Sequence, residues 1–126
     1  DVDIDLALLF TPDYTLPALR LAKKAPTWED PIRVIGHPFG LPGVIIMDGR
    51  VANPDAPRPN GYQVSSYMFL SALVAPGNSG SPVVNSRNEV VSVLLVGLAP
   101  HRSYDPGGGS TYARLKAFAG DYFERN

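Results

Sequence analysis

The chain has 126 residues, of which 44% are hydrophobic and 18% are charged, and its formal net charge is −1. This composition is typical of one small globular domain and argues against a disordered chain. The charge does not indicate a nucleic-acid-binding surface, and no stretch approaches the roughly 20 apolar residues of a membrane-spanning helix. The absence of cysteine excludes disulfides, thiolate metal sites and a cysteine nucleophile. It does not determine the compartment, since exported bacterial and viral domains can also lack cysteine.

Twelve glycines and 13 prolines separate short apolar runs, a pattern that favours an all-β chain. Residues 6–10 predict a first strand, which residues 11–13 end with a turn. Residues 15–31 contain three prolines and are therefore expected to form an extended connector without a long helix. Three leucines of this connector are expected to cover an edge of the core: Leu16, Leu19 and Leu21.

The middle of the chain predicts a strand at residues 32–35, followed by a turn at 36–40. Two more strands, 44–46 and 50–52, flank Asp48-Gly49, a pair that is favoured in tight hairpins. Residues 53–60 contain three prolines and are predicted to be a loop.

The second half predicts a long strand at residues 62–70 and a buried strand at 90–96. Helical periodicity is found only near the C-terminal end, where apolar residues form one face: Leu115, Phe118, Ala119, Tyr122 and Phe123. About six strands followed by one C-terminal helix predict a small closed antiparallel β-barrel.

A serine between glycines stands out at residues 76–82, which read Pro-Gly-Asn-Ser-Gly-Ser-Pro. Gly77 can adopt backbone angles that other residues avoid, so its N–H and that of Ser79 can point at one spot. Two such amides form an oxyanion hole, and the loss of one donor typically costs about 3–4 kcal/mol of transition-state stabilisation. Gly80 keeps the approach to the hydroxyl clear. A glycine-rich turn without any chemistry would explain this motif equally well.

Residues 77–82 resemble the Gly-(Asp/Asn)-Ser-Gly-Gly-Pro signature of trypsin-like serine peptidases, and Ser79 occupies the position of the nucleophile. The asparagine and the preceding proline are most similar to the HtrA-type enzymes. Asp5-Leu6-Ala7-Leu8-Leu9 resembles the segment that carries the triad aspartate. Residues 16–21 and 34–40 are similar to the inter-barrel linker and the first strand and turn of the second barrel. Residues 109–112 and the predicted helix resemble the end of that fold, so the matching blocks cover most of the chain in the family's order.

The resemblance implies a chymotrypsin-like fold that begins at the triad aspartate. Residues 1–14 would end a first barrel, residues 15–31 would link the two barrels, and residues 32–126 would form the second barrel and C-terminal helix. The implied function is a serine endopeptidase that cleaves polypeptides through an acyl-enzyme, without a cofactor or metal. Gly77 and Ser79 would provide the oxyanion hole.

Asp5 would hold a histidine in the correct tautomer and stabilise its charged form. Without the resemblance, the alternating residues Asp1, Asp3 and Asp5 would simply face solvent at the end of a strand. Only Asp5 directly precedes the apolar run, which favours it as the triad member.

Neither of the two histidines matches the family's general base, which precedes the aspartate. His37 lies in the predicted turn, where relatives have several residue types without a catalytic role. His101 follows the expected groove strand and either contacts substrate or lies in a plain surface loop. Because a serine without a positioned base is a poor nucleophile, the chain alone is expected to be nearly inactive. An N-terminal barrel or a separate chain would supply the catalytic histidine.

The expected substrate groove follows residues 93–97, with Val96 and Gly97 beside the substrate backbone. Leu73 occupies the position at the base of the primary pocket, so a medium apolar or small substrate side chain is expected rather than Arg or Lys. One alternative is a non-catalytic peptide-binding or structural module with the same fold. The other is an unrelated small β-barrel with a chance serine turn. The two histidines have no metal-ligand spacing, and neither a nucleic acid nor a membrane is an expected partner.

Overall fold

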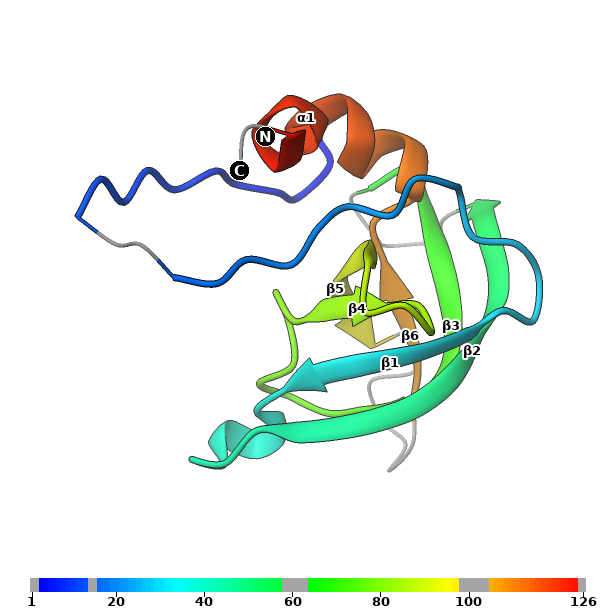
Figure 1. Ribbon diagram of the computed structural model, residues 1–126. Helices are drawn as coiled ribbons and strands as arrows, with labels where there is room; N and C mark the ends of the chain where they lie inside the picture. Colours follow the sequence, from blue (N-terminus) through cyan, green and yellow to red (C-terminus); the bar gives the residue numbers. More distant parts are fainter. Residues whose placement is uncertain (1–2, 14–15, 58–63, 98–104, 125–126) are drawn as a thin grey trace.

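The computed structural model describes residues 3–13, 16–57, 64–97 and 105–124. In this part of the chain six antiparallel strands close into a barrel in the order β1-β2-β3-β6-β5-β4, and a helix follows the last strand (Figure 1). The predicted closed barrel with a C-terminal helix is therefore confirmed. The elements are β1 (Pro31–Gly36), the short 3-10 turn η1 (Pro38–Gly40), β2 (Ile45–Pro57), β3 (Ser66–Val74), β4 (Pro82–Val84), β5 (Val90–Gly97), β6 (Asp105–Gly109) and α1 (Tyr112–Glu124).

Aliphatic side chains fill the interior of the barrel. Val34 on β1, Val51 on β2, Leu70 on β3 and Val83 on β4 are completely buried in one cluster. Alternate residues of β1 are buried, because successive side chains of a strand point to opposite faces. Each buried Val or Leu contributes about 1.5–3 kcal/mol. The alternating apolar residues that predicted β1 from the sequence are therefore the residues that β1 contributes to the core.

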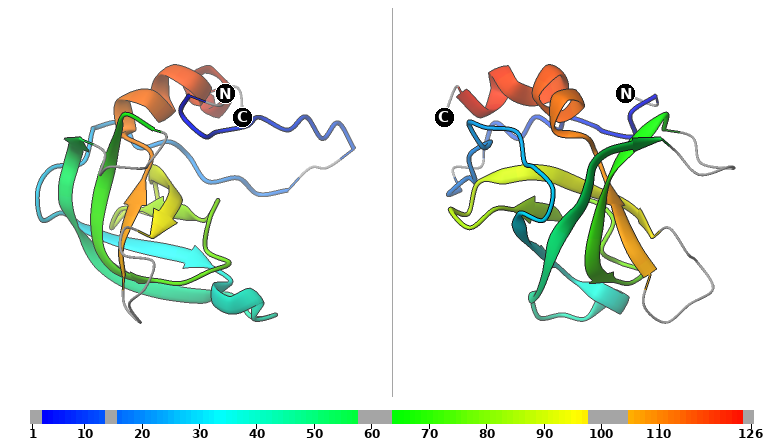
Figure 2. Two further views of the ribbon diagram at one scale, coloured as in Figure 1. Left: turned by 180° about the vertical axis from the view of Figure 1, so that it is seen from behind. Right: turned by 90° about the vertical axis from the view of Figure 1, so that its right-hand side faces the viewer.

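α1 covers one outer side of the barrel (Figures 1 and 2). Leu115 and Ala119 are buried and form a second apolar cluster with Val84 and Val90. The helix was predicted from its periodicity and is confirmed, although Tyr122 is 52% exposed and lies off the buried face. No described helix combines the length and apolar character that are needed to cross a bilayer.

The predicted hairpin at Asp48-Gly49 is wrong. β2 continues through both residues, since Asp48 pairs with Arg33 and Gly49 pairs with Ile32. The chain instead reverses over residues 37–44, which include η1. A Cβ on Gly49 would lie 2.5 Å from the backbone oxygen of Ser71 on β3. Glycine is needed here because two strands approach closely, and not because the chain turns.

The predicted proline loop at residues 53–60 is also wrong for its first half. β2 extends to Pro57, and register shifts around Asn53 accommodate the prolines within the sheet. Residues 58–60 lie outside the described part of the chain. The strand predicted at 62–70 is observed as β3, displaced to Ser66–Val74, and the strand predicted at 90–96 is observed as β5.

The predicted strand at residues 6–10 does not form in this structure. The segment has no strand partner among the described residues, and Leu9 and Phe10 are 87% and 89% exposed. Leu6 alone packs against the core clusters. Strand hydrogen bonds need a neighbouring strand, so an apolar pattern cannot create a strand by itself.

The connector prediction holds for one of its three leucines. Leu16 and Leu19 are 71% and 40% exposed. Leu21 packs against the second cluster and forms an isolated bridge with Val90. The bridge attaches the end of the connector to β5, so only this part of the connector covers a core edge.

Candidate active site

Two consecutive β-turns carry the serine motif between β3 and β4. The amide of Asn78 donates to Ala75 O at 3.1 Å, and the amide of Ser81 donates to Asn78 O at 2.9 Å. Gly77 and Gly80 occupy the third positions of these turns, with φ values of 99° and 87°. A positive φ at this position is a requirement of type II turns and favours glycine. The two glycines therefore allow the chain to make both turns around Ser79.

Ser79 lies at the tip of the second turn, and the residue is exposed. Its Oγ donates a hydrogen bond to Leu95 O on β5, at 3.3 Å. The turn itself is attached to β5 because the amide of Gly80 donates to Leu94 O at 2.7 Å and the amide of Leu94 donates to Ser81 O at 2.9 Å. These bonds hold the hydroxyl next to one edge of β5.

The backbone amides of Gly77 and Ser79 do not donate to any backbone carbonyl of the described residues. The carbonyl of Pro76 accepts a hydrogen bond from Phe39 N at 2.5 Å. Because the described chain has no cis peptide, the N–H of Gly77 points away from that carbonyl. Neither amide is therefore bound to a backbone carbonyl among the described residues, and an oxyanion hole needs two amides of this kind.

A groove of about 590 Å³ opens beside Ser79. Asp5 lines the same groove, so the structure brings together the two residues that were predicted to be catalytic. The remaining walls come from three segments of the chain: residues 6–9; Gly80 with Val93, Leu94 and Leu95; and Leu115, Phe118, Ala119 and Phe123 of α1. The groove is therefore largely apolar, with the carboxylate and the hydroxyl among its few polar groups.

The predicted substrate positions are only partly visible. Val96 and Gly97 lie on β5, where they pair on one side with Gly108 and Gly107 of β6. On its other side β5 pairs with β4 only as far as Val93, so the edge at residues 95–97 has no strand partner in the described part of the chain. Leu73 lies on β3, but its side chain is not described, and His101 lies outside the described residues.

His37 is on the surface and does not line the groove of Ser79. Its Nδ1 lies 2.9 Å from Leu41 O. A carbonyl oxygen only accepts, so Nδ1 must carry the proton and donate it. His37 is thus engaged within its own turn, and no histidine among the described residues lines the groove.

Asn78 is a feature that the sequence analysis missed. Its side chain is completely buried, and neither its amide oxygen nor its amide nitrogen has a hydrogen-bond partner among the described residues. It packs against Gly36, where an added Cβ would lie 2.7 Å from Asn78 Oδ1 and would also overlap Ser81 Oγ. In the sequence Asn78 is a polar residue within the serine motif, and no neighbouring residue predicts that its side chain is buried.

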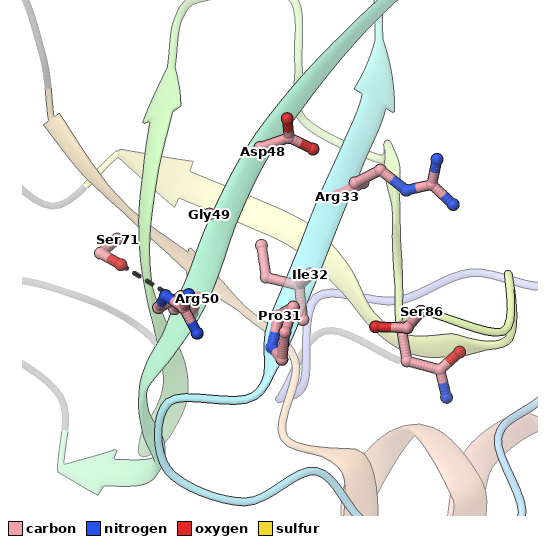
Figure 3. Close-up of a pocket in the computed structure, with 9 residues that line it drawn as sticks. Pro31, Ile32, Arg33, Asp48, Gly49, Arg50, Ser71 and Ser86 are labelled. Atoms are coloured by element: carbon pink, nitrogen blue, oxygen red, sulfur yellow. Dashed lines mark hydrogen bonds between the residues drawn. The ribbon is translucent and has the colours of Figure 1, made fainter.

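A second cavity of about 590 Å³ lies on the outer face of β1 and β2 (Figure 3) and contains none of the predicted site residues. Arg33 binds Asn88 Oδ1 through Nη2, and Arg50 Nη1 donates to Glu29 O at 3.1 Å. Figure 3 shows these two arginines pointing to different sides, so their charges do not converge on one ligand. Among the described residues no group of three or more His, Cys, Asp or Glu could hold a metal ion.

Comparisons with known proteins identify the family and the fold of the chain. A family model described as a trypsin-like peptidase domain matches residues 1–93, which include both Asp5 and Ser79. The inactive form of the Rv3671c protease of M. tuberculosis is similar at a TM-score of 0.77 and 20% identity, over 96% of this chain and 62% of that chain. The active form of the same protease is similar at a TM-score of 0.76 and 20% identity, over 95% of this chain and 54% of that chain. An inactive form in which one serine is replaced by alanine is similar at a TM-score of 0.75 and 19% identity, over 96% of this chain and 60% of that chain.

The chain thus spans less than two thirds of the length of these three structures. At this level of identity the likeness shows a common fold, which is the chymotrypsin-like barrel predicted from the sequence.

Proposed function

Because the chain belongs to the trypsin-like peptidase family, we propose that it is the part of a serine endopeptidase that carries the nucleophile Ser79 and the triad aspartate Asp5. One observation carries this proposal: an exposed serine on a turn built by two positive-φ glycines shares a groove with an aspartate from a distant part of the chain.

In the proposed reaction Ser79 Oγ attacks the carbonyl carbon of a peptide bond and transfers its proton to a histidine. The carbonyl oxygen becomes an oxyanion, which the amides of Gly77 and Ser79 stabilise. The histidine returns the proton to the departing amine, and the acyl-enzyme forms. A water molecule, deprotonated by the same histidine, then attacks the acyl carbonyl, and the ester bond to Ser79 Oγ breaks. The acid leaves, and the histidine returns the proton to Ser79 Oγ. Asp5 orients the histidine throughout.

The histidine is proposed to come from an N-terminal barrel, or an associated chain, outside these 126 residues. One contact supports this source: His37, the histidine among the described residues, donates to Leu41 O on the surface and does not line the groove of Ser79. Without its base the chain is proposed to be nearly inactive. Residues 1–14 would then belong to the first barrel, residues 15–31 to the linker and residues 32–126 to the second barrel.

The substrate is proposed to be a polypeptide that pairs with the edge of β5 at residues 95–97, which has no strand partner among the described residues. Addition of an extended peptide to an unpaired strand edge supplies main-chain hydrogen bonds, and pockets for alternate side chains supply specificity. The edge at residues 95–97 lies where Leu95 O already contacts the Ser79 hydroxyl. Val96, Gly97 and His101 are proposed to contact the substrate, and Leu73 is proposed to make the primary pocket apolar.

A second candidate function is a non-catalytic peptide-binding module with the protease fold. The observation that favours it is the bond from Ser79 Oγ to Leu95 O, because the hydroxyl contacts no base among the described residues. Such a module would use the same groove and the same free edge of β5, but it would not form an acyl-enzyme.

Labelling with a fluorophosphonate probe separates the two functions. The encoded full-length protein is expected to react at Ser79, because the probe mimics the carbonyl and needs an activated hydroxyl. Ser79→Ala is expected to abolish labelling, and Asp5→Asn to slow it by roughly 10⁴-fold through loss of the correct histidine tautomer. Asp13→Asn, a change of another exposed aspartate outside the groove, is the control. A folded full-length protein that binds peptides but does not react at Ser79 would support the binding module.

A further inference from the structure

A cavity of about 360 Å³ lies between the connector and α1. Three cationic side chains line it: Arg20 and Lys23 of the connector and Lys116 of α1. The other walls come from Leu21, Ala22, Tyr112 and Phe123. We propose that this cavity binds an organic phosphate, with the phosphate group between the three cations and an apolar group against the two aromatic rings. Phe123 is the one described residue that lines both this cavity and the groove of Ser79, so the site does not depend on the proposed reaction.

Three hydrogen bonds fix the wall that the connector provides. Val90 N donates to Arg20 O at 2.7 Å, and Ala22 N donates to Val90 O at 2.9 Å. The hydroxyl of Tyr112 donates to Ala22 O at 2.6 Å, which joins the same segment to the start of α1. Arg20 and Lys23 therefore extend from a backbone that is bound to both β5 and α1. A site whose walls are already in place loses less free energy on binding than one that must first be ordered.

One face of α1 provides the opposite wall. Lys116 and Phe123 follow Tyr112 by four and eleven residues, so at about 100° per residue the three side chains fall within about 40° of one another around the helix. Lys116 Nζ lies 6.0 Å from the centre of the Tyr112 ring. The helix therefore places a cation next to aromatic surface, and a ligand with an anionic and an apolar part can use both.

The three cations have no partner of opposite charge in the described part of the chain. Arg20, Lys23 and Lys116 form no ion pair and no side-chain hydrogen bond with another described residue. None of the described residues that line the cavity is acidic. Three like charges around one cavity repel one another, and a bound anion would remove this repulsion.

A phosphate monoester matches these donors better than a single carboxylate does. It carries a charge of about −1.5 to −2 near pH 7 and three acceptor oxygens, whereas a carboxylate carries one charge and two oxygens. The planar guanidinium of Arg20 can bind two phosphate oxygens, and the ammonium groups of Lys23 and Lys116 act as point charges. An apolar substituent on the phosphate would then cover the rings of Tyr112 and Phe123.

The cavity of Figure 3 does not share these properties, although it also contains two cations. Arg33 binds Asn88, and Arg50 donates to the backbone carbonyl of Glu29. Asp48 adds a negative charge to the lining of that cavity. Only in the cavity beside α1 are several cations left for a ligand, within the part of the chain that the structure describes.

Calorimetric titration of the full-length protein with phenyl phosphate tests the site. This compound joins one aromatic ring to a phosphate dianion, and a dissociation constant of about 0.1–1 mM is expected for its size. Inorganic phosphate lacks the ring and is expected to bind about tenfold more weakly. Benzyl alcohol lacks the charge and is expected not to bind measurably. Raising NaCl from about 50 to about 500 mM is expected to weaken the binding of phenyl phosphate several-fold, because salt screens the cations.

Charge substitutions locate the bound phosphate. Lys116→Gln and Arg20→Gln are each expected to weaken binding about three- to tenfold, through the loss of a charge-assisted hydrogen bond. Lys24→Gln is the matched control, because it removes an equal charge next to Lys23 but does not line the cavity. It is expected to change the dissociation constant by less than about twofold. All three substituted side chains are exposed, so the variants are expected to remain folded.

Ser79→Ala is expected to bind phenyl phosphate with the parental affinity, so the site and the proposed function can fail separately. Equal affinities of Lys116→Gln, Arg20→Gln and Lys24→Gln would overturn the site. Phenyl phosphate that binds no more tightly than inorganic phosphate would overturn it as well. A triglutamate peptide that binds more tightly than phenyl phosphate, with the same dependence on Lys116, would overturn the assignment to a phosphate and indicate an acidic peptide.

Discussion

At the scale of single residues, the serine turn depends on glycines that leave room for neighbouring groups. Gly77 is needed for its positive φ and for the turn that packs on its α-carbon. Gly36 is needed for another reason, because the buried side chain of Asn78 occupies the space where its Cβ would be. The conformation of the serine turn thus depends on a residue of β1 that is distant in the sequence.

Gly36→Ala is expected to destabilise the chain by about 1–3 kcal/mol, the usual range for overpacking a buried site. The added methyl group would overlap Asn78 Oδ1 and Ser81 Oγ, and both residues are buried. Urea denaturation of the 126-residue chain measures the change. Gly43→Ala is the matched control, because a Cβ there meets nothing within 4 Å. An equal effect of the two substitutions would contradict the described packing around Asn78.

At the scale of elements, the barrel decides what each local pattern becomes. Asp48-Gly49 has the sequence of a hairpin turn, yet the pair lies within β2 because both neighbouring strands bind it there. The periodicity of α1 is satisfied by contacts with β4 and β5, and the same helix face lines the groove of Ser79.

The change Gly49→Asn distinguishes the observed strand from the predicted turn. Asparagine tolerates the left-handed conformation of a hairpin turn, but it cannot fit where a Cβ meets the backbone of Ser71 at 2.5 Å. We expect a loss of about 1–3 kcal/mol in the free energy of unfolding. Gly40→Asn is the control, since Gly40 has a φ of 67° and open space around it. A well-tolerated Gly49→Asn would indicate that the hairpin turn forms after all.

Leu115→Ala tests the attachment of α1 to the barrel. Leu115 is only 3% exposed, and the loss of its side chain from the second cluster is expected to cost about 2–5 kcal/mol. Asp121→Ala, on an exposed position of the same helix, is expected to change stability by less than about 0.5 kcal/mol. Thermal unfolding followed by circular dichroism measures both. Similar melting temperatures for the two variants would argue against the packing of α1 on β4 and β5.

At the scale of the whole molecule, residues 6–10 form an apolar segment that the barrel does not cover. Leu8, Leu9 and Phe10 are 45%, 87% and 89% exposed, although their sequence pattern is that of a buried strand. The proposed function explains the pattern, because this segment would pair with strands of the proposed N-terminal barrel. Figure 1 shows the segment passing beside α1 and away from the barrel.

Burial of this segment should therefore differ between the full-length protein and the 126-residue chain. Leu9→Ser is expected to destabilise the full-length protein by about 1.5–3 kcal/mol, the value of one buried apolar side chain. The same substitution in the 126-residue chain is expected to have little effect, since Leu9 is exposed there. Denaturation of both proteins, with hydrogen exchange at residues 6–10, provides the measurement. Equal sensitivity in the two proteins would contradict the proposed first barrel.

Several properties of this protein were determined by its sequence alone. The strand at β1, the buried strand β5 and the helix α1 follow from alternation and periodicity, which involve only residues within a few positions of one another. The motif around Ser79 likewise predicted its turn, because the positive-φ glycines are local requirements.

Other properties were decided only by the tertiary structure, because they depend on which distant segments meet. β2 passes through Asp48-Gly49 and the following prolines because β1 and β3 provide its hydrogen bonds. Asn78 is buried because Gly36 leaves space for it, and Asp5 reaches the groove of Ser79 because the next residue, Leu6, packs against the core clusters. The contact of Phe39 with Pro76 joins two turns that no local pattern relates, since the closure of the barrel brings them together.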